Sequence, residues 1–115
     1  MANARERRDK KMHARIEVRG SSIHGKGVFA RRHLREGDWI GRFEGDPTKR
    51  NGTYVLWLFD EDGSEVGIRG RNELRFLNHG VPANAEFEDA DLYATRDVQP
   101  GDEILIDYGD AWAEG

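Results

Sequence analysis

The chain has 115 residues, of which 37% are hydrophobic and 35% charged, so it can build one domain with a single modest core. It contains no cysteine, which excludes disulfides, thiolate zinc sites and cysteine nucleophiles. No apolar run approaches the roughly 20 residues of a membrane span, and the N-terminus lacks the apolar region of a signal peptide. We therefore expect a cytoplasmic protein with no membrane partner.

The formal net charge of −4 conceals opposite charges at the two ends of the chain. Residues 1–15 contain six Lys/Arg and two acidic residues, whereas residues 86–115 contain ten Asp/Glu and one arginine. The acidic C-terminal third favours a cationic partner over direct binding of nucleic acid, because its field attracts positive charge. The basic residues 1–14 are typical of a flexible, solvated arm, so we expect the folded domain to comprise residues 15–115.

Short strand patterns follow the arm along the rest of the chain. Apolar alternation, or apolar runs of strand length, predicts strands within residues 14–20, 24–30, 39–45, 53–59, 64–70, 86–98 and 103–109. The turn sequence Asp-Glu-Asp-Gly at 60–63 predicts a hairpin, and Pro100-Gly101 predicts another turn. No internal repeat and no strand–glycine loop–helix unit occurs, so we predict an all-β domain of several small sheets.

Four stretches carry a resemblance to a known family. In chain order they are HGKGVFA (24–30), EGDWIGRFEG (36–45), RFLNHGVPAN (75–84) and PGDEILIDYG (100–109). Together they resemble the SET domain of protein-lysine methyltransferases, over roughly residues 15–112. The resemblance implies a β-clip fold of small curved sheets with a C-terminal pseudoknot. It also implies S-adenosyl-L-methionine as cofactor and a lysine-containing protein as substrate, and it leaves a homodimer open.

The third stretch sets a polar Asn-His pair directly after Phe76 and Leu77, which is more than a plain turn requires. An adenine edge presents donors and acceptors that a fixed amide and backbone groups must meet. The resemblance implies that Asn78 and His79 bind the cofactor, on a segment anchored by its apolar residues. Glycines would let the backbone approach the methionine part of the cofactor. The full set of cofactor-binding residues that the resemblance implies is Gly25, Lys26, Gly27, Arg75, Phe76, Asn78, His79, Tyr108 and Trp112.

The resemblance implies that Tyr108 is the catalytic residue, because it matches the tyrosine that closes the last motif. A tyrosine hydroxyl can orient the amine and the transferring methyl group in an in-line displacement, for which alignment matters most. Tyr54 matches the tyrosine that lines the lysine channel. In an extended strand the two-residue period puts Ile104, Ile106 and Tyr108 on one face, and Ile106, which the resemblance places among the substrate-binding residues, offers no hydroxyl that would hold a methylated amine. We therefore expect di- or trimethylated product.

The chain departs from the family pattern in ways that keep a rival interpretation open. Gly80 stands where the family usually has serine, Ile106 stands where many relatives have an aromatic residue, and cysteine-rich flanking segments are absent. The rival is a catalytically silent SET-like module that binds a lysine-rich protein partner. A metal site is not expected, because His24, His79 and the acidic residues have no ligand spacing.

Overall fold

A computed structural model describes residues 3–50, 52, 54–59 and 61–107. One α-helix, α1 (Ala4–Arg15), precedes the strands, and a short 3₁₀ helix, η1 (Glu73–Phe76), interrupts them. The strands are β1 (Ile16–Gly20), β2 (Lys26–Ala30), β3 (Trp39–Arg42), β4 (Gly45–Thr48), β5 (Val55–Phe59), β6 (Glu65–Gly70), β7 (Asn78–His79), β8 (Ala85–Glu88), β9 (Asp91–Ala94) and β10 (Leu105–Ile106).

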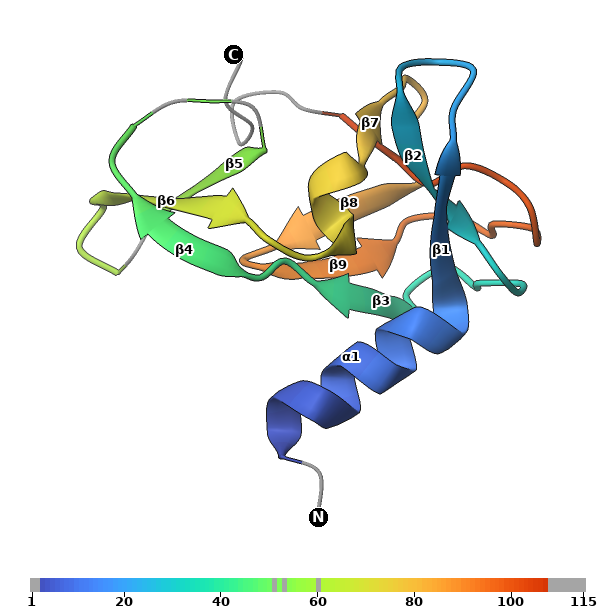
Figure 1. Ribbon diagram of the computed structural model, residues 1–115, viewed down its shortest axis with the longest axis horizontal. Coiled ribbons are helices and arrows are strands. Elements are labelled where there is room, and N and C mark those ends of the chain that lie inside the picture. Colours follow the sequence, from blue (N-terminus) through green and yellow to red (C-terminus); the bar gives the residue numbers. More distant parts are fainter. Residues whose placement is uncertain (1–2, 51, 53, 60, 108–115) are drawn as a thin grey trace.

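In the described part of the chain these strands form four small sheets, in the orders β1–β2, β7–β10, β3–β9–β8 and β4–β6–β5. Figure 1 shows β4–β6–β5 at one side of the molecule, β1–β2 at the other and β3–β9–β8 between them. Neighbours pair antiparallel except β7 and β10, which are parallel. The prediction of an all-β domain built from several small sheets is confirmed.

The hairpin predicted from Asp-Glu-Asp-Gly is confirmed: β5 pairs antiparallel with β6, with Trp57 opposite Gly67. Gly63 adopts a φ of +85°, in the left-handed region that favours glycine, and the Asp62 carboxylate accepts a hydrogen bond from the Ser64 amide at 2.9 Å. The prediction of one strand over 86–98 is wrong. Its first half is a second hairpin, β8–β9, because Asp89 takes a φ of +54° and reverses the chain.

Residues 4–15 form α1, and their polar sequence does not predict that this helix packs against the domain. Asn3 caps the helix by accepting the Glu6 amide at 2.8 Å, and Met12 is buried at 2% exposure. Met12 lies against Gly41, where an added Cβ would be 2.6 Å from the sulfur. The structure thus gives the expected arm a helical form, while its mobility and the division at residue 15 stay predictions. Within the described residues no helix is long and apolar enough to span a membrane.

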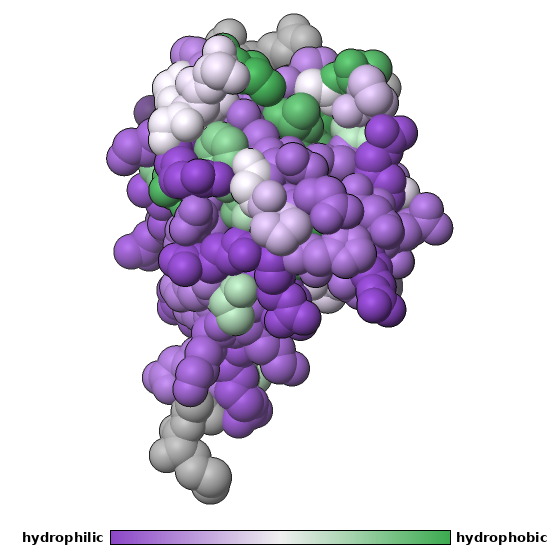
Figure 2. All heavy atoms as spheres, turned by 90° about the vertical axis from the view of Figure 1, so that its right-hand side faces the viewer, coloured by the Kyte–Doolittle hydropathy of each residue, from purple (hydrophilic) through white to green (hydrophobic). Residues whose placement is uncertain are grey.

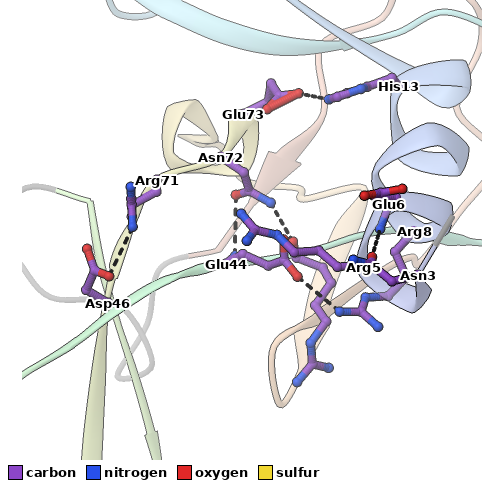
Figure 3. A network of polar contacts seen from close by, with 11 residues as sticks. Asn3, Arg5, Glu6, Arg8, His13, Glu44, Asp46, Arg71, Asn72 and Glu73 are labelled. Atoms are coloured by element: carbon purple, nitrogen blue, oxygen red, sulfur yellow. Dashed lines mark hydrogen bonds and ion pairs between the residues drawn. The ribbon is translucent and has the colours of Figure 1, made fainter.

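Ion pairs and hydrogen bonds join α1 to the body of the molecule (Figure 3). The Glu44 carboxylate forms ion pairs with Arg8 Nη2 at 3.1 Å and with Arg5 Nε at 3.4 Å. His13 contacts Glu73 at the start of η1. Between α1, β4 and η1 lies a cavity of about 610 Å³, lined mainly by charged residues of both signs. Glu44 is thus paired with two arginines of α1 and Glu73 with a histidine of α1. These three contacts join the helix to the rest of the molecule.

The core gathers the large apolar side chains of nearly every element, including Val28, Leu34, Ile40, Phe43, Leu56, Leu74, Leu77, Leu92, Val98 and Ile104. Two of them, Leu74 and Leu77, anchor η1 and the residue before β7 at 0% and 2% exposure. Burying such a side chain contributes about 1.5–3 kcal/mol, so the polar pair that follows is carried on a fixed support.

The last described segment runs between two elements that lie far apart in sequence. The Ile104 amide donates to Val28 of β2 at 2.7 Å, and one residue later β10 pairs with β7. Residues 101–106 therefore join the second-strand region to the Asn-His segment. The further course of the C-terminal segment, on which the predicted pseudoknot depends, lies outside the described residues.

Candidate functional site

Asn78 is the point at which three distant segments meet. Its side chain is 6% exposed, and its Nδ2 donates to the carbonyls of His24 at 3.2 Å and Lys26 at 3.1 Å and to Glu103 Oε2 at 2.7 Å. The amide hydrogens are thus engaged within the protein. The backbone of Asn78 and His79 runs beside it along β7, and the His79 ring is exposed at this edge.

The parallel pairing of β7 with β10 fixes that backbone. Asn78 lies opposite Leu105 and His79 opposite Ile106, and the Gly80 amide donates to the Ile106 carbonyl at 3.1 Å. His79 Nδ1 lies 3.9 Å from the Asp107 carboxylate.

The loop between β1 and β2 closes over Asn78 and contains the two glycines that the sequence singled out. Gly25 has a φ of +42°, and an added Cβ would meet no atom within 4 Å, so the glycine keeps the backbone conformation and leaves open space beside it. Gly27 is different. An added Cβ would overlap Glu103 Oε2 and lie 2.9 Å from its Cδ, so this glycine admits the Glu103 carboxylate.

Phe76 gathers three further residues that the sequence singled out. Lys26 Nζ lies 5.3 Å and Arg75 Cζ 4.2 Å from the ring centroid, both within cation–π range. Tyr54 meets the same ring edge-on, with centroids 5.7 Å apart and ring planes at 75°. The structure therefore places the predicted substrate residue Tyr54 directly beside predicted cofactor residues. Tyr54 is 40% exposed and has a φ of +71°, an uncommon value for a residue other than glycine.

The remaining predicted residues divide into one that is described and two that are not. Ile106 is 3% exposed and belongs to the core cluster together with Ile104, as the two-residue period predicted for one face of the strand. Its predicted place in a lysine channel stays a prediction. Tyr108 and Trp112 lie outside the described residues.

Sequence reasoning assigned no role to Asn84, Glu103 or Ser21, and the structure gives each one. Asn84 clamps the last segment: its Oδ1 accepts the Leu105 amide at 2.8 Å and its Nδ2 donates to the Glu103 carbonyl at 2.9 Å. The Glu103 carboxylate accepts hydrogen bonds from the Asn78 side-chain amide and, at 2.8 Å, from the Ser21 hydroxyl. The signal for Asn84 was present, since this second asparagine closes the same motif as Asn78.

The surface around this site is mostly polar. Figure 2 shows the face that carries β1 and β2 as largely hydrophilic, with hydrophobic residues gathered toward the end where the β1–β2 loop lies. Ile23 in that loop and Val81 just after β7 are 52% and 74% exposed. Across the described residues, no group of three His, Asp or Glu side chains is arranged to hold a metal.

Away from the site, the Asp97 carboxylate accepts the Glu36 amide at 3.1 Å and lies beside His33. The backbone hydrogen bond and the His33 imidazole hold the pKa of this exposed carboxyl below its usual value.

Comparison with known proteins gives one family and one fold. A family model described as the SET domain matches residues 25–109. No curated protein sequence matches the chain. Among solved structures, "ctPRC2 in an autoinhibited conformation bound to S-adenosylmethionine" is similar with a TM-score of 0.74 and 19% identity over 88% of this chain. The methyltransferase domain of human histone-lysine N-methyltransferase SETMAR is similar with a TM-score of 0.70 and 20% identity over 81% of this chain.

The matched region is a minor part of both of those structures. It covers 16% of the ctPRC2 chain and 44% of the SETMAR chain. At these identities the likeness extends to the fold, and it agrees with the small-sheet architecture described above.

Proposed function

Because the chain belongs to the SET-domain family, we propose that it is an S-adenosylmethionine-dependent methyltransferase that modifies the ε-amine of lysine in a protein substrate. The family and the fold support methyl transfer from S-adenosylmethionine in general. Lysine as the acceptor and Tyr108 as the catalytic residue are the finer parts of the proposal.

The observation that carries the proposal is the convergence at Asn78. One buried amide binds carbonyls of the first motif (24–30) and a carboxylate of the last (100–109), while it belongs to the third (75–84). Partners as far as 54 positions from Asn78 in the chain are thus held at one place. A satisfied turn at Asn78-His79-Gly80 would need none of these long-range partners.

The residues of this place suit the parts of the cofactor. The carboxylate of its methionine part needs cations, and Lys26 and Arg75 stand together at Phe76. We assign the fixed donors and acceptors that its adenine needs to the Asn78-His79 segment, and Gly25 leaves open space beside the loop. When bound there, the cofactor supplies a methyl group activated on a sulfonium ion.

The protein must then present a neutral amine in line with that methyl group. Lysine has an unperturbed pKa of about 10.4, so its neutral form near pH 7 costs on the order of 4–5 kcal/mol. Burial in an apolar channel lowers this cost, because a low dielectric disfavours the charged amine. Tyr54, half exposed beside Phe76, is the described residue best placed to orient the amine, and we assign the aligning hydroxyl to Tyr108.

Transfer of a labelled methyl group tests the proposal. The protein, labelled S-adenosylmethionine and a lysine-rich protein mixture should give labelled bands, and mass spectrometry should find di- or trimethyl-lysine. Tyr108→Phe should lower kcat and kcat/KM alike while leaving cofactor affinity unchanged, because it removes a contact made in the transition state. A fully active Tyr108→Phe variant would remove the catalytic assignment.

The rival hypothesis, a catalytically silent SET-like module, predicts a different result in the same assay. Such a module binds a lysine-rich protein but leaves that protein unlabelled at every enzyme concentration. The Gly80 departure that kept this rival open now has a packing reason, because an added Cβ there would lie 2.5 Å from Leu105 Cδ1. Gly80 therefore does not argue against catalysis.

A further inference from the structure

The carboxylate of Glu103 lies at the centre of the converging segments. Oε2 accepts Asn78 Nδ2 at 2.7 Å, and Oε1 accepts the Ser21 hydroxyl at 2.8 Å. Ser21 in turn closes the β1–β2 loop, since its amide donates to the Gly25 carbonyl at 2.8 Å and its hydroxyl accepts the Ile23 amide at 3.0 Å. One side chain therefore tethers both the loop and the Asn78 amide.

Gly27 shows that the chain is built around this carboxylate. Its φ lies outside the left-handed region, so the backbone conformation does not require glycine at this position. Any larger residue would push its Cβ into Glu103 Oε2 and bring it to 3.1 Å from Asn78 Nδ2. The glycine is needed because Glu103 occupies the space beside it.

We propose that Glu103 is a positioning residue of the cofactor site, acting through Asn78 and the 21–25 loop; this inference rests on the proposed function. The two hydrogens of the Asn78 amide are shared among two loop carbonyls at 3.1–3.2 Å and Glu103 Oε2, the nearest acceptor at 2.7 Å, which orients the amide. The same carboxylate holds Ser21. Glu103 thus sets the spacing between the backbone of residues 25–26 and that of residues 78–79, before any ligand arrives.

Substitution at Glu103 separates hydrogen bonding from packing. Glu103→Ala should weaken binding of S-adenosylhomocysteine by about tenfold or more, since buried donors lose their acceptor. Glu103→Gln keeps an oxygen that accepts Asn78, and its NH₂ can donate to the Ser21 hydroxyl in a bond of reversed direction, so it should restore most of the affinity. Glu65→Ala, which removes an exposed carboxylate on β6, is the matched control and should bind like wild type. Calorimetry measures all four proteins.

The side-chain amide of Asn78 gives a direct signature that general destabilisation does not produce. In ¹⁵N-correlated spectra of the ligand-free protein, the Asn78 NH₂ pair should shift in Glu103→Ala and return near its wild-type position in Glu103→Gln. An unchanged Asn78 pair in Glu103→Ala contradicts the proposal.

A double-mutant cycle between Gly27 and Glu103 tests the same contact from the other side. Gly27→Ala alone should weaken binding, because the new Cβ displaces the carboxylate. In the Glu103→Ala background that space is free, so Gly27→Ala should add little further loss. Additive losses overturn the proposal.

The outcomes distinguish this inference from the function beneath it. A wild-type protein that binds no S-adenosylhomocysteine overturns the proposed function and, with it, the role of Glu103 in cofactor binding. Wild-type binding that survives Glu103→Ala overturns the Glu103 assignment alone. A Glu103→Gln variant as weak as Glu103→Ala shows that negative charge, and not orientation, is what the site requires, and it likewise overturns the positioning role.

Discussion

The glycines around Asn78 have different structural roles. Gly25 adopts a conformation that other residues disfavour, whereas Gly27 and Gly80 leave room for the side chains of Glu103 and Leu105. A glycine can therefore be required for two distinct reasons, backbone freedom or space for a neighbour. At Gly27 the second reason determines where the Asn78 amide is fixed.

Gly80 offers a test of this distinction. Gly80→Ser restores the residue usual in the family, yet it should destabilise this protein by about 1 kcal/mol, because the added Cβ overpacks Leu105. In the Leu105→Ala background, where the side chain that the new Cβ would meet is shortened, Gly80→Ser should lower the free energy of unfolding by less than it does in wild type. Urea unfolding of the four proteins measures the coupling. A Gly80→Ser variant as stable as wild type would show that Leu105 moves aside at no cost.

The helix α1 and the short element η1 link the N-terminal region to the site. Met12 is packed on Gly41, and His13 contacts Glu73, the first residue of η1, which leads through Leu77 to Asn78. The packing of α1 against the domain depends mainly on the buried Met12 side chain. The ion pairs of the helix lie near the surface, where each contributes only about 0–1 kcal/mol.

Removal of the Met12 side chain tests whether α1 is docked in solution. Met12→Ala should lower the free energy of unfolding by about 2–5 kcal/mol, as for other buried methionines. Lys10→Ala, on an exposed position of the same helix, should change it by less than about 0.5 kcal/mol. If the two substitutions change the free energy of unfolding equally in urea, α1 is not docked in solution, and residues 4–15 form the flexible arm that their composition indicates.

The elements differ in how far the sequence predicts them. The β5–β6 hairpin follows from an apolar run and a glycine turn, both local signals. By contrast, the β8–β9 reversal depends on Asp89 adopting a positive φ, and α1 depends on a contact between Met12 and a glycine 29 positions away. The motifs gave most of the candidate site and contain Asn84 and Glu103, but the roles of these two residues depend on contacts that only the tertiary structure supplies.

Charge is distributed unevenly over the whole molecule. Six of the 18 basic residues lie in α1, where Arg5 and Arg8 are paired with Glu44, while β8, the β8–β9 turn and the segment after β9 expose Glu86, Glu88, Asp89 and Asp97. A lysine-bearing substrate would meet an attractive field on the acidic side.

If that field assists binding, the KM for a lysine-rich peptide should rise with salt, because exposed charges are screened beyond about 8–10 Å at physiological ionic strength. The variant Glu86→Gln/Glu88→Gln should show a smaller rise. Steady-state kinetics over a series of salt concentrations measures both. A KM that is independent of salt would show that the acidic side is a solvated surface only.

The most direct test of the account is calorimetric titration of the wild-type protein with S-adenosylmethionine and S-adenosylhomocysteine. The convergence of three motifs at Asn78 predicts a single saturable site for both compounds. Asn78→Ala should weaken it by about tenfold or more, because His24, Lys26 and Glu103 each lose the same partner. Gln99→Ala, at an exposed position beside the Pro100-Gly101 turn, should bind like wild type. No heat of binding at millimolar ligand with folded wild-type protein would contradict the account.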